Sequence, residues 1–536
     1  MAGSIGYAER LSWRDDVGGT LGTPEFEEAD DAELQRKIDA LAELIRESRA
    51  KSGGMVVHTG AGISTSIGIP DFRGPNGVWT AQKRGAPMPE AKCTLDTAVP
   101  SLTHMALVEL RKHGYVRYLV SCNVDCLHLR SGFPREDLAE LHGNCFAERC
   151  ERCETEYIRD FEMSTVGFEY TGRTCDKCGA FVEDQKNKRK RASASDSRDS
   201  FAPRRSSRAS TSRSAVARLR DQVLDWDDVL PPEELRRAEK HSRETCLSLV
   251  LGSSLQITPS CDIPLLTVKK RKGKRGKLVI VNLQETPKDR MATMLVRAKT
   301  DVVMAGVMRR LGLTVPEYVR YDRVVVGARL FGTPADPERR TFAVRVGSSH
   351  GWDNPVPWLA GVSFTIRDGG GLENRPQSRF ELLDARTRDA LIADSRMADG
   401  YDDEPDKPET MHFFGGPCFE TATRLSDEEV RALLEGKKNR ARFFLTLAEG
   451  CTERRAWFEV PMEDLELETG HESLTTHSVM TSRRRYEDRD PDPGPAPARR
   501  DEKKKKLPLP RMEDKKQQNE APDPVAARIR AAIAMR

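Results

Sequence analysis

Residues 55–79 constrain the fold of this chain more than any other stretch. The apolar run at 55–57 is long enough for one buried strand of a parallel sheet. Two closely spaced glycines, Gly60 and Gly62, follow it, and a second block, GIPDFRG, occupies residues 68–74. A strand that runs into such a turn is typical of nucleotide-binding sites, because backbone N–H groups can approach a diphosphate there. The turn alone is a weak signal, because most such turns are simple tight connections between a strand and a helix.

Three further apolar runs repeat this arrangement. Residues 118–120, 247–251 and 277–281 each read as a short buried strand, and each ends directly before a polar segment. Amphipathic helices are expected at 27–50 and 100–114. Ligands of open α/β sheets bind beyond the carboxyl ends of the strands. The sequence therefore predicts an α/β fold, a Rossmann-like domain whose site lies where these strands end.

Four of the 12 cysteines form two C-x-x-C pairs, which predict one zinc site. They are Cys150, Cys153, Cys175 and Cys178, and 21 residues separate the two pairs (175 − 153 − 1). Four thiolates leave no open coordination position, so the predicted Zn²⁺ is structural. A redox C-x-x-C is the alternative, and the presence of two pairs argues against it.

Six ordered motifs together resemble the sirtuin family of NAD-dependent protein deacylases. They are GAGIS with GIPDFR, CNVD at 122–125, LHGN at 141–144, the paired cysteines, GSSLQ at 252–256 and VNLQ at 281–284. The resemblance covers roughly residues 30–320. It is strongest to the nuclear, class IV branch, because of GPNGVW at 74–79 and LDW at 224–226.

The resemblance implies a role for each matching residue. His142 corresponds to the general base, and Asn123 and Asp125 correspond to residues that line the nicotinamide pocket. Asp225 and Trp226 correspond to a segment beside the substrate peptide. The positions implied to bind NAD, besides His142, are Gly60, Ala61, Gly62, Thr65, Asp71, Phe72, Arg73, Trp79, Cys122, Gly252, Ser253, Ser254, Asn282, Gln284 and Thr300.

Cys122 and Cys126 depart from the family pattern, which has Gln at the first position and usually Gly at the second. The Gln normally reaches the ribose, whereas a thiol is shorter and a poor hydrogen-bonding group. Cys122 could be a low-pKa thiol that acts as a redox brake, or a small buried hydrophobe.

The remaining segments complete a domain plan for the 536 residues. A mobile leader (1–26) precedes a catalytic domain (27–147 and 215–315), which is interrupted by a zinc module (148–182) and a disordered Arg/Ser-rich insertion (183–214). Alternating apolar and polar residues predict a β-rich domain over 316–470, and a disordered charged tail follows at 471–536.

The resemblance implies an NAD-dependent deacylase of histone or other protein lysines that produces nicotinamide and O-acyl-ADP-ribose. Protein mono-ADP-ribosyl transfer and a weakly active chromatin scaffold are the alternatives. The basic segments could be nuclear-import signals and contacts to chromatin, including DNA, or solvated disorder that keeps the chain soluble. The resemblance to the class IV branch implies a nuclear location. No apolar run approaches the ~18–20 residues that span a membrane.

Overall fold

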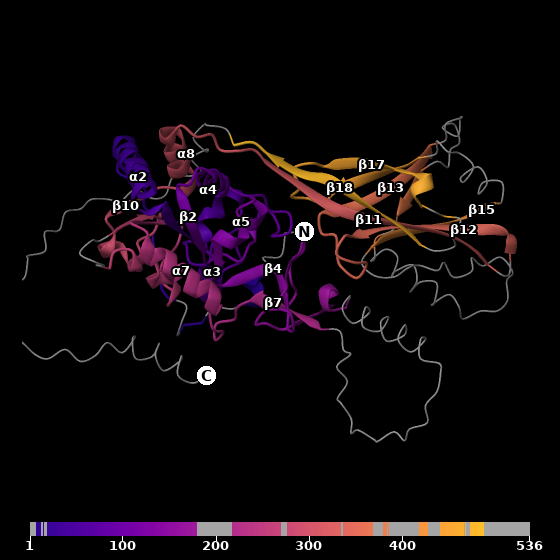
Figure 1. Ribbon diagram of the computed structural model, residues 1–536, viewed down its shortest axis with the longest axis horizontal. Helices are drawn as coiled ribbons and strands as arrows, with labels where there is room; N and C mark the ends of the chain where they lie inside the picture. The colour runs from indigo at the N-terminus through magenta and orange to yellow at the C-terminus, as the bar shows by residue number, and fades with distance from the viewer. Residues whose placement is uncertain are drawn as a thin grey trace, which may run out of the picture. The chain divides into compact units, whose positions relative to one another are not determined.

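The computed structural model describes residues 7–11, 14–15, 19–179, 217–269, 276–333, 336–367, 379–382, 384, 418–426, 440–465, 467 and 472–486 (Figure 1). The chain divides into two compact units, Met1–Pro497 and Ala498–Arg536. The predicted Arg/Ser-rich insertion and the second unit lie outside the described residues.

A six-stranded parallel sheet forms the centre of the first half of the chain, with strand order β10-β9-β8-β1-β2-β3. Every residue of β1 and β8 is buried, because helices cover both faces of the sheet. The sheet confirms the predicted Rossmann-like fold. Its strands are β1 (Met55–Thr59), β2 (Val116–Ser121), β3 (Leu138–Glu140), β8 (Leu247–Leu251), β9 (Lys277–Val281) and β10 (Met294–Val296).

The helices divide between the two faces of this sheet (Figure 1). On one face, α2 (Asp31–Ser52), α4 (Leu102–Lys112) and α8 (Thr300–Leu311) pack through a shared apolar cluster. On the other face lies α7 (Pro232–Glu244). The shorter helices are α1 (Tyr7–Arg10), α3 (Val78–Arg84) and α5 (Leu127–Arg130).

Helix α2 shows how local signals set an element's ends. The Asp30 side chain accepts a hydrogen bond from the Glu33 N–H, and Gly53 ends the helix with φ 71°, a left-handed conformation that glycine adopts at little cost. Its apolar residues recur at helical spacing, and of these Ile38, Leu41 and Ile45 are buried and Leu34 is partly buried.

A small antiparallel sheet of order β5-β4-β7-β6 holds the cysteine pairs. Its strands are β4 (Gly143–Cys150), β5 (Glu156–Ile158), β6 (Tyr170–Thr174) and β7 (Arg218–Val223). Strand β4 begins one residue after His142 and ends on Cys150. One strand therefore joins the predicted base to the predicted metal site.

The predicted β-rich domain is a sandwich of two antiparallel sheets with one apolar core, in orders β15-β12-β11-β18 and β14-β13-β16-β17 (Figure 1). Trp358, Phe364 and Phe443 are among its fully buried side chains. The strands are β11 (Tyr318–Thr333), β12 (Asp336–Ser348), β13 (Leu359–Arg367), β14 (Arg379–Leu382), β15 (Phe419–Ser426), β16 (Arg440–Leu447), β17 (Arg455–Pro461) and β18 (Ser473–Arg484).

Strand β18 corrects the predicted start of the disordered tail at residue 471. It pairs with β11 along most of its length, from Tyr318↔Arg484 to Ala328↔Ser473. Serine, threonine and arginine side chains dominate this strand, so it lacks the apolar alternation that indicates a strand, and the pairing with β11 stabilises it. Among the described residues, no helix has the length and apolar character needed to cross a membrane.

Candidate functional site

Two glycine-rich turns, at the ends of β1 and β8, form the floor of the site. The Gly62 N–H donates to the Gly252 carbonyl at 2.9 Å, and the Gly60 N–H donates to the Leu251 carbonyl at 3.1 Å. A Cβ atom on Gly60 or Gly62 would lie within 2.7 or 2.8 Å of Ser253 or Gly252 backbone atoms. These glycines are therefore required first for the close approach of the two turns.

A cavity of about 960 Å³ opens beyond these strand ends. It is lined by every residue predicted to bind NAD or substrate peptide. Asn123 and His142 also line it, whereas Asp125 does not. The structure therefore brings together residues from five of the six ordered motifs, and Asp225 and Trp226 from LDW at 224–226.

The segment after β2 gives Asn123 and Asp125 different positions. The Asn123 amide donates to the Gly60 carbonyl at 3.2 Å and lies on the cavity wall. Asp125 is 7% exposed, and its carboxylate accepts hydrogen bonds from the Ser64 hydroxyl at 2.7 Å and the Leu127 N–H at 3.0 Å. In this structure Asp125 joins the two loops behind the wall, in contrast to the direct lining position expected from the sequence.

His142 has a defined tautomer. Its Nδ1 lies 3.1 Å from the Cys122 carbonyl oxygen, which can only accept, so Nδ1 carries the hydrogen. Nε2 is then the basic nitrogen, and it lies 3.3 Å from the Ser260 hydroxyl. Burial, with a contribution from Arg73, lowers the pKa of His142 to about 4, so the imidazole is neutral at pH 7.

Aromatic side chains form one wall of the cavity. The ring centroids of Phe72 and Trp79 are 4.5 Å apart, and those of Trp79 and Trp226 are 5.0 Å apart. The Arg73 guanidinium lies 4.6 Å from the centre of the Trp79 ring. Burial lowers the pKa of Arg73 to about 10, which leaves it charged at neutral pH. The wall thus combines an apolar shield with one cation suited to phosphate or carboxylate oxygens.

The N-terminal segment contributes residues that the sequence did not reveal. The Trp79 indole donates to the Leu11 carbonyl at 3.0 Å, and the Gln284 amide donates to the Thr23 carbonyl at 2.7 Å. Tyr7, Leu11 and Glu25 line the cavity. The described part of the predicted mobile leader therefore has defined contacts with the site. It lacks periodicity, so no local signal could have indicated them.

Cys122 is partly buried and lines the cavity, whereas Cys126 is fully buried. Burial raises the pKa of the Cys122 thiol to about 11, so it is protonated at neutral pH, which favours the small-hydrophobe interpretation over the redox brake. Cys126 is buried and adopts φ 62°. That conformation explains why glycine suits this position and makes Cys126 a strained replacement.

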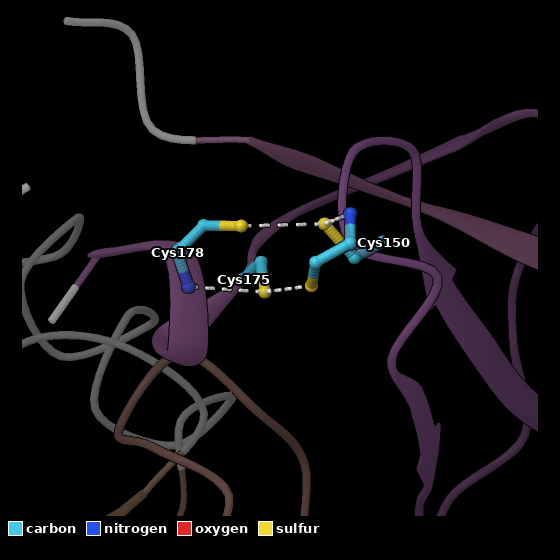
Figure 2. Close-up of side chains that lie close together, drawn as sticks. Cys150, Cys175 and Cys178 are labelled. Atoms are coloured by element: carbon cyan, nitrogen blue, oxygen red, sulfur yellow. Dashed lines mark hydrogen bonds between the residues drawn. The ribbon is translucent and has the colours of Figure 1, made fainter. Parts of the chain in front are cut away.

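The four predicted zinc ligands converge, and Figure 2 shows Cys150, Cys175 and Cys178 among them. The Cys150 and Cys178 sulfurs are 3.8 Å apart, and those of Cys153 and Cys175 are 3.6 Å apart. Ligands about 2.3 Å from a tetrahedral zinc ion lie about 3.8 Å from one another, and a disulfide would need about 2.05 Å. All four ligand atoms lie within 4.8 Å of one another. The geometry fits one structural Zn²⁺ with no open position.

Several known proteins are similar to this chain. The model of the Sir2 family matches residues 87–259. The NAD-dependent protein deacetylase SRT1 of Oryza sativa subsp. indica is 45% identical over 363 residues, which cover 68% of this chain and 65% of that protein. A solved structure described as Sir2 with a p53 peptide and NAD+ is 29% identical, covers 51% of this chain and 98% of that chain, and has a TM-score of 0.34.

An animal relative is matched over more of its own length. The NAD-dependent protein deacetylase Sirt6 of Drosophila melanogaster is 41% identical over 315 residues, which cover 59% of this chain and 87% of that protein. Because identity of this extent includes nearly the whole fly protein, the chain belongs to the Sir2 family, the sirtuins.

Proposed function

We propose that this chain is an NAD-dependent protein-lysine deacetylase that produces nicotinamide and O-acyl-ADP-ribose. Two relatives, at 45% and 41% identity, are named NAD-dependent protein deacetylases. The observation that carries the proposal is the position of His142, a neutral imidazole of fixed tautomer on the wall of a large cavity. Such a group can accept a proton from a hydroxyl held beside Nε2.

The cavity residues divide the work of binding. NAD, when bound, supplies the bond between ribose and nicotinamide that the reaction breaks. The glycine turns at Gly60 and Gly252 offer backbone to a diphosphate, and Arg73 offers a charged fork of donors. Phe72 and Trp79 exclude water from the reacting end, which limits simple hydrolysis.

The acylated lysine would enter along the segment that follows β7. Asp225 and Trp226 line the cavity there, and Trp226 packs on Trp79. An extended peptide beside this segment can bind through its main chain, which tolerates varied sequence around the lysine. We further propose histones as substrates and a nuclear location, supported by the basic runs of the sequence at 186–191 and 503–506.

The test uses full-length protein with NAD and acetylated or unacetylated histone peptides, and mass spectrometry of all products. We expect nicotinamide and O-acetyl-ADP-ribose in equal amounts, and their loss in His142→Ala. His113→Ala is the matched control, because His113 is an exposed histidine beyond the end of α4. ADP-ribosylated protein without deacetylated peptide would replace this proposal with ADP-ribosyl transfer.

A further inference from the structure

Ser260 lies outside all of the sequence motifs, and it makes contacts in the cavity. It begins a short 3-10 turn, Ser260–Asp262, and is 6% exposed. Its Oγ lies 2.9 Å from the Ile257 carbonyl oxygen and 3.3 Å from His142 Nε2. The Ser260 hydroxyl therefore contacts His142 Nε2, the nitrogen that must take up a proton.

The hydrogens at this contact can be counted. His142 Nδ1 donates to the Cys122 carbonyl, so the neutral imidazole has no hydrogen on Nε2. The hydroxyl has one hydrogen and two acceptors, and the Ile257 carbonyl is the nearer of them. With that hydrogen on Ile257, a lone pair of Oγ is directed to Nε2. Once Nε2 carries a proton, it can donate to this lone pair without movement of any heavy atom.

We propose that Ser260 is a positioning residue for His142, whose hydroxyl oxygen accepts the Nε2 proton while the hydroxyl hydrogen stays on the Ile257 carbonyl. No covalent bond to Ser260 forms or breaks. During turnover, which rests on the proposed function, the proton leaves a substrate hydroxyl for Nε2, and Ser260 stabilises the resulting imidazolium. A hydrogen bond to the charged form is worth about twice one to the neutral form, so Ser260 makes the base stronger.

Arg73 and the thiols near His142 do not stabilise the imidazolium. Arg73 lowers the pKa of His142, and therefore opposes protonation. The nearby Cys122 and Cys261 thiols have pKa values raised to about 11 by burial, so neither supplies a negative charge at neutral pH. Asp225 lines the same cavity from the segment after β7. The residue before it, Leu224, donates its N–H to the His142 carbonyl at 3.3 Å.

The first experiment does not depend on activity. In protein labelled with ¹⁵N-histidine, the Nε2 and Nδ1 resonances of His142 report its tautomer and titration, and His142→Gln assigns them. We expect Ser260→Ala to move the Nε2 resonance at neutral pH and to lower the pKa of His142 by roughly 0.5–1 pH unit. Ser260→Thr, which keeps the hydroxyl, should restore both values.

The second experiment measures kcat and KM for NAD. Ser260→Ala should reduce kcat about three- to tenfold and leave KM nearly unchanged, since the contact matters once the proton has moved. Ser242→Ala is the matched control, because it removes a fully buried hydroxyl with no hydrogen-bond partner among the described residues. If Ser260→Ala unfolds, Ser260→Gly takes its place.

The outcomes separate the two proposals. An unchanged His142 resonance and titration in both Ser260→Ala and Ser260→Gly would overturn the role of Ser260, whatever the activity. A wild-type protein that does not deacetylate, but whose His142 responds to Ser260→Ala as expected, would contradict the proposed function alone.

Discussion

The parallel sheet and the β-sandwich use their strands in opposite ways. In the parallel sheet, strands such as β1 and β8 are buried along their whole length, and polar side chains collect beyond their ends around the cavity. In the sandwich, the strands alternate, with Phe443 buried in the core and the Arg442–Glu459 ion pair outside it.

The difference separates activity from stability. Cavity side chains such as His142 can be changed with little loss of packing, because they face open space. A core ring such as Phe443, stacked 5.3 Å from Phe364 and 5.1 Å from Phe458, cannot be truncated without leaving a void. Four predictions test this contrast, in order of decreasing expected effect.

The largest effect is expected from loss of zinc, which should lower both the stability and the activity of the catalytic half of the chain. Cys175→Ser should abolish zinc binding, a contribution of order 10 kcal/mol in small zinc modules. Because β4 connects Cys150 to His142, deacetylation should be lost and the catalytic half should unfold more easily. Metal analysis and thermal unfolding measure this. Cys93→Ser, at a half-buried cysteine outside the cluster, is the control, and full activity without zinc would contradict the prediction.

A core truncation in the sandwich should lower stability and leave NAD binding unchanged. Phe443→Ala should lower the free energy of unfolding by about 3–5 kcal/mol. NAD affinity, measured by calorimetry, should stay unchanged. Phe444→Ala, one residue along β16 and half-buried, should cost less. A loss of NAD affinity in Phe443→Ala as large as its loss of stability would show that the two regions are coupled.

Buried histidines should make the catalytic half sensitive to acid. Burial lowers the pKa of His58 and of His104 to about 3, against an unfolded value near 6.5. Their stabilising effect is complete above pH 6.5 and is lost as the pH falls toward 3, by up to about 1.4 kcal/mol per pH unit each. Urea unfolding between pH 7 and 5 should therefore be up to about 2 kcal/mol less pH-dependent in His58→Gln, and unchanged in the exposed control His113→Gln.

The smallest effect is expected at Cys122, where a longer side chain would extend into the cavity. Cys122→Gln should raise kcat/KM for NAD several-fold, equivalent to about 0.5–1.5 kcal/mol, with stability unchanged. The double variant Cys122→Gln, Cys126→Gly controls for crowding and relieves the positive φ of Cys126. Mild peroxide should not inhibit the wild type through this thiol, because its pKa is about 11. No gain in either Gln variant would make Cys122 a neutral replacement.

The sequence by itself determined the elements whose signals are local. The run at 55–57 before Gly60 and Gly62 predicted the strand and its turn, and the structure has both. The spacing of the cysteine pairs predicted a four-thiolate site, because two C-x-x-C turns can present four sulfurs to one ion. His142 was found through its neighbours in LHGN, and it lies on the cavity wall.

Only the tertiary structure decided the contacts between distant segments. Ser260 meets His142 across 118 positions of sequence, and Gln284 meets Thr23 across 261. Asp125 does not line the cavity, and its carboxylate accepts hydrogen bonds from the Ser64 hydroxyl and the Leu127 N–H. Strand β18 is stabilised by its antiparallel pairing with β11. In each case the free energy comes from a partner that local sequence does not specify, so neither periodicity nor motif spacing could reveal it.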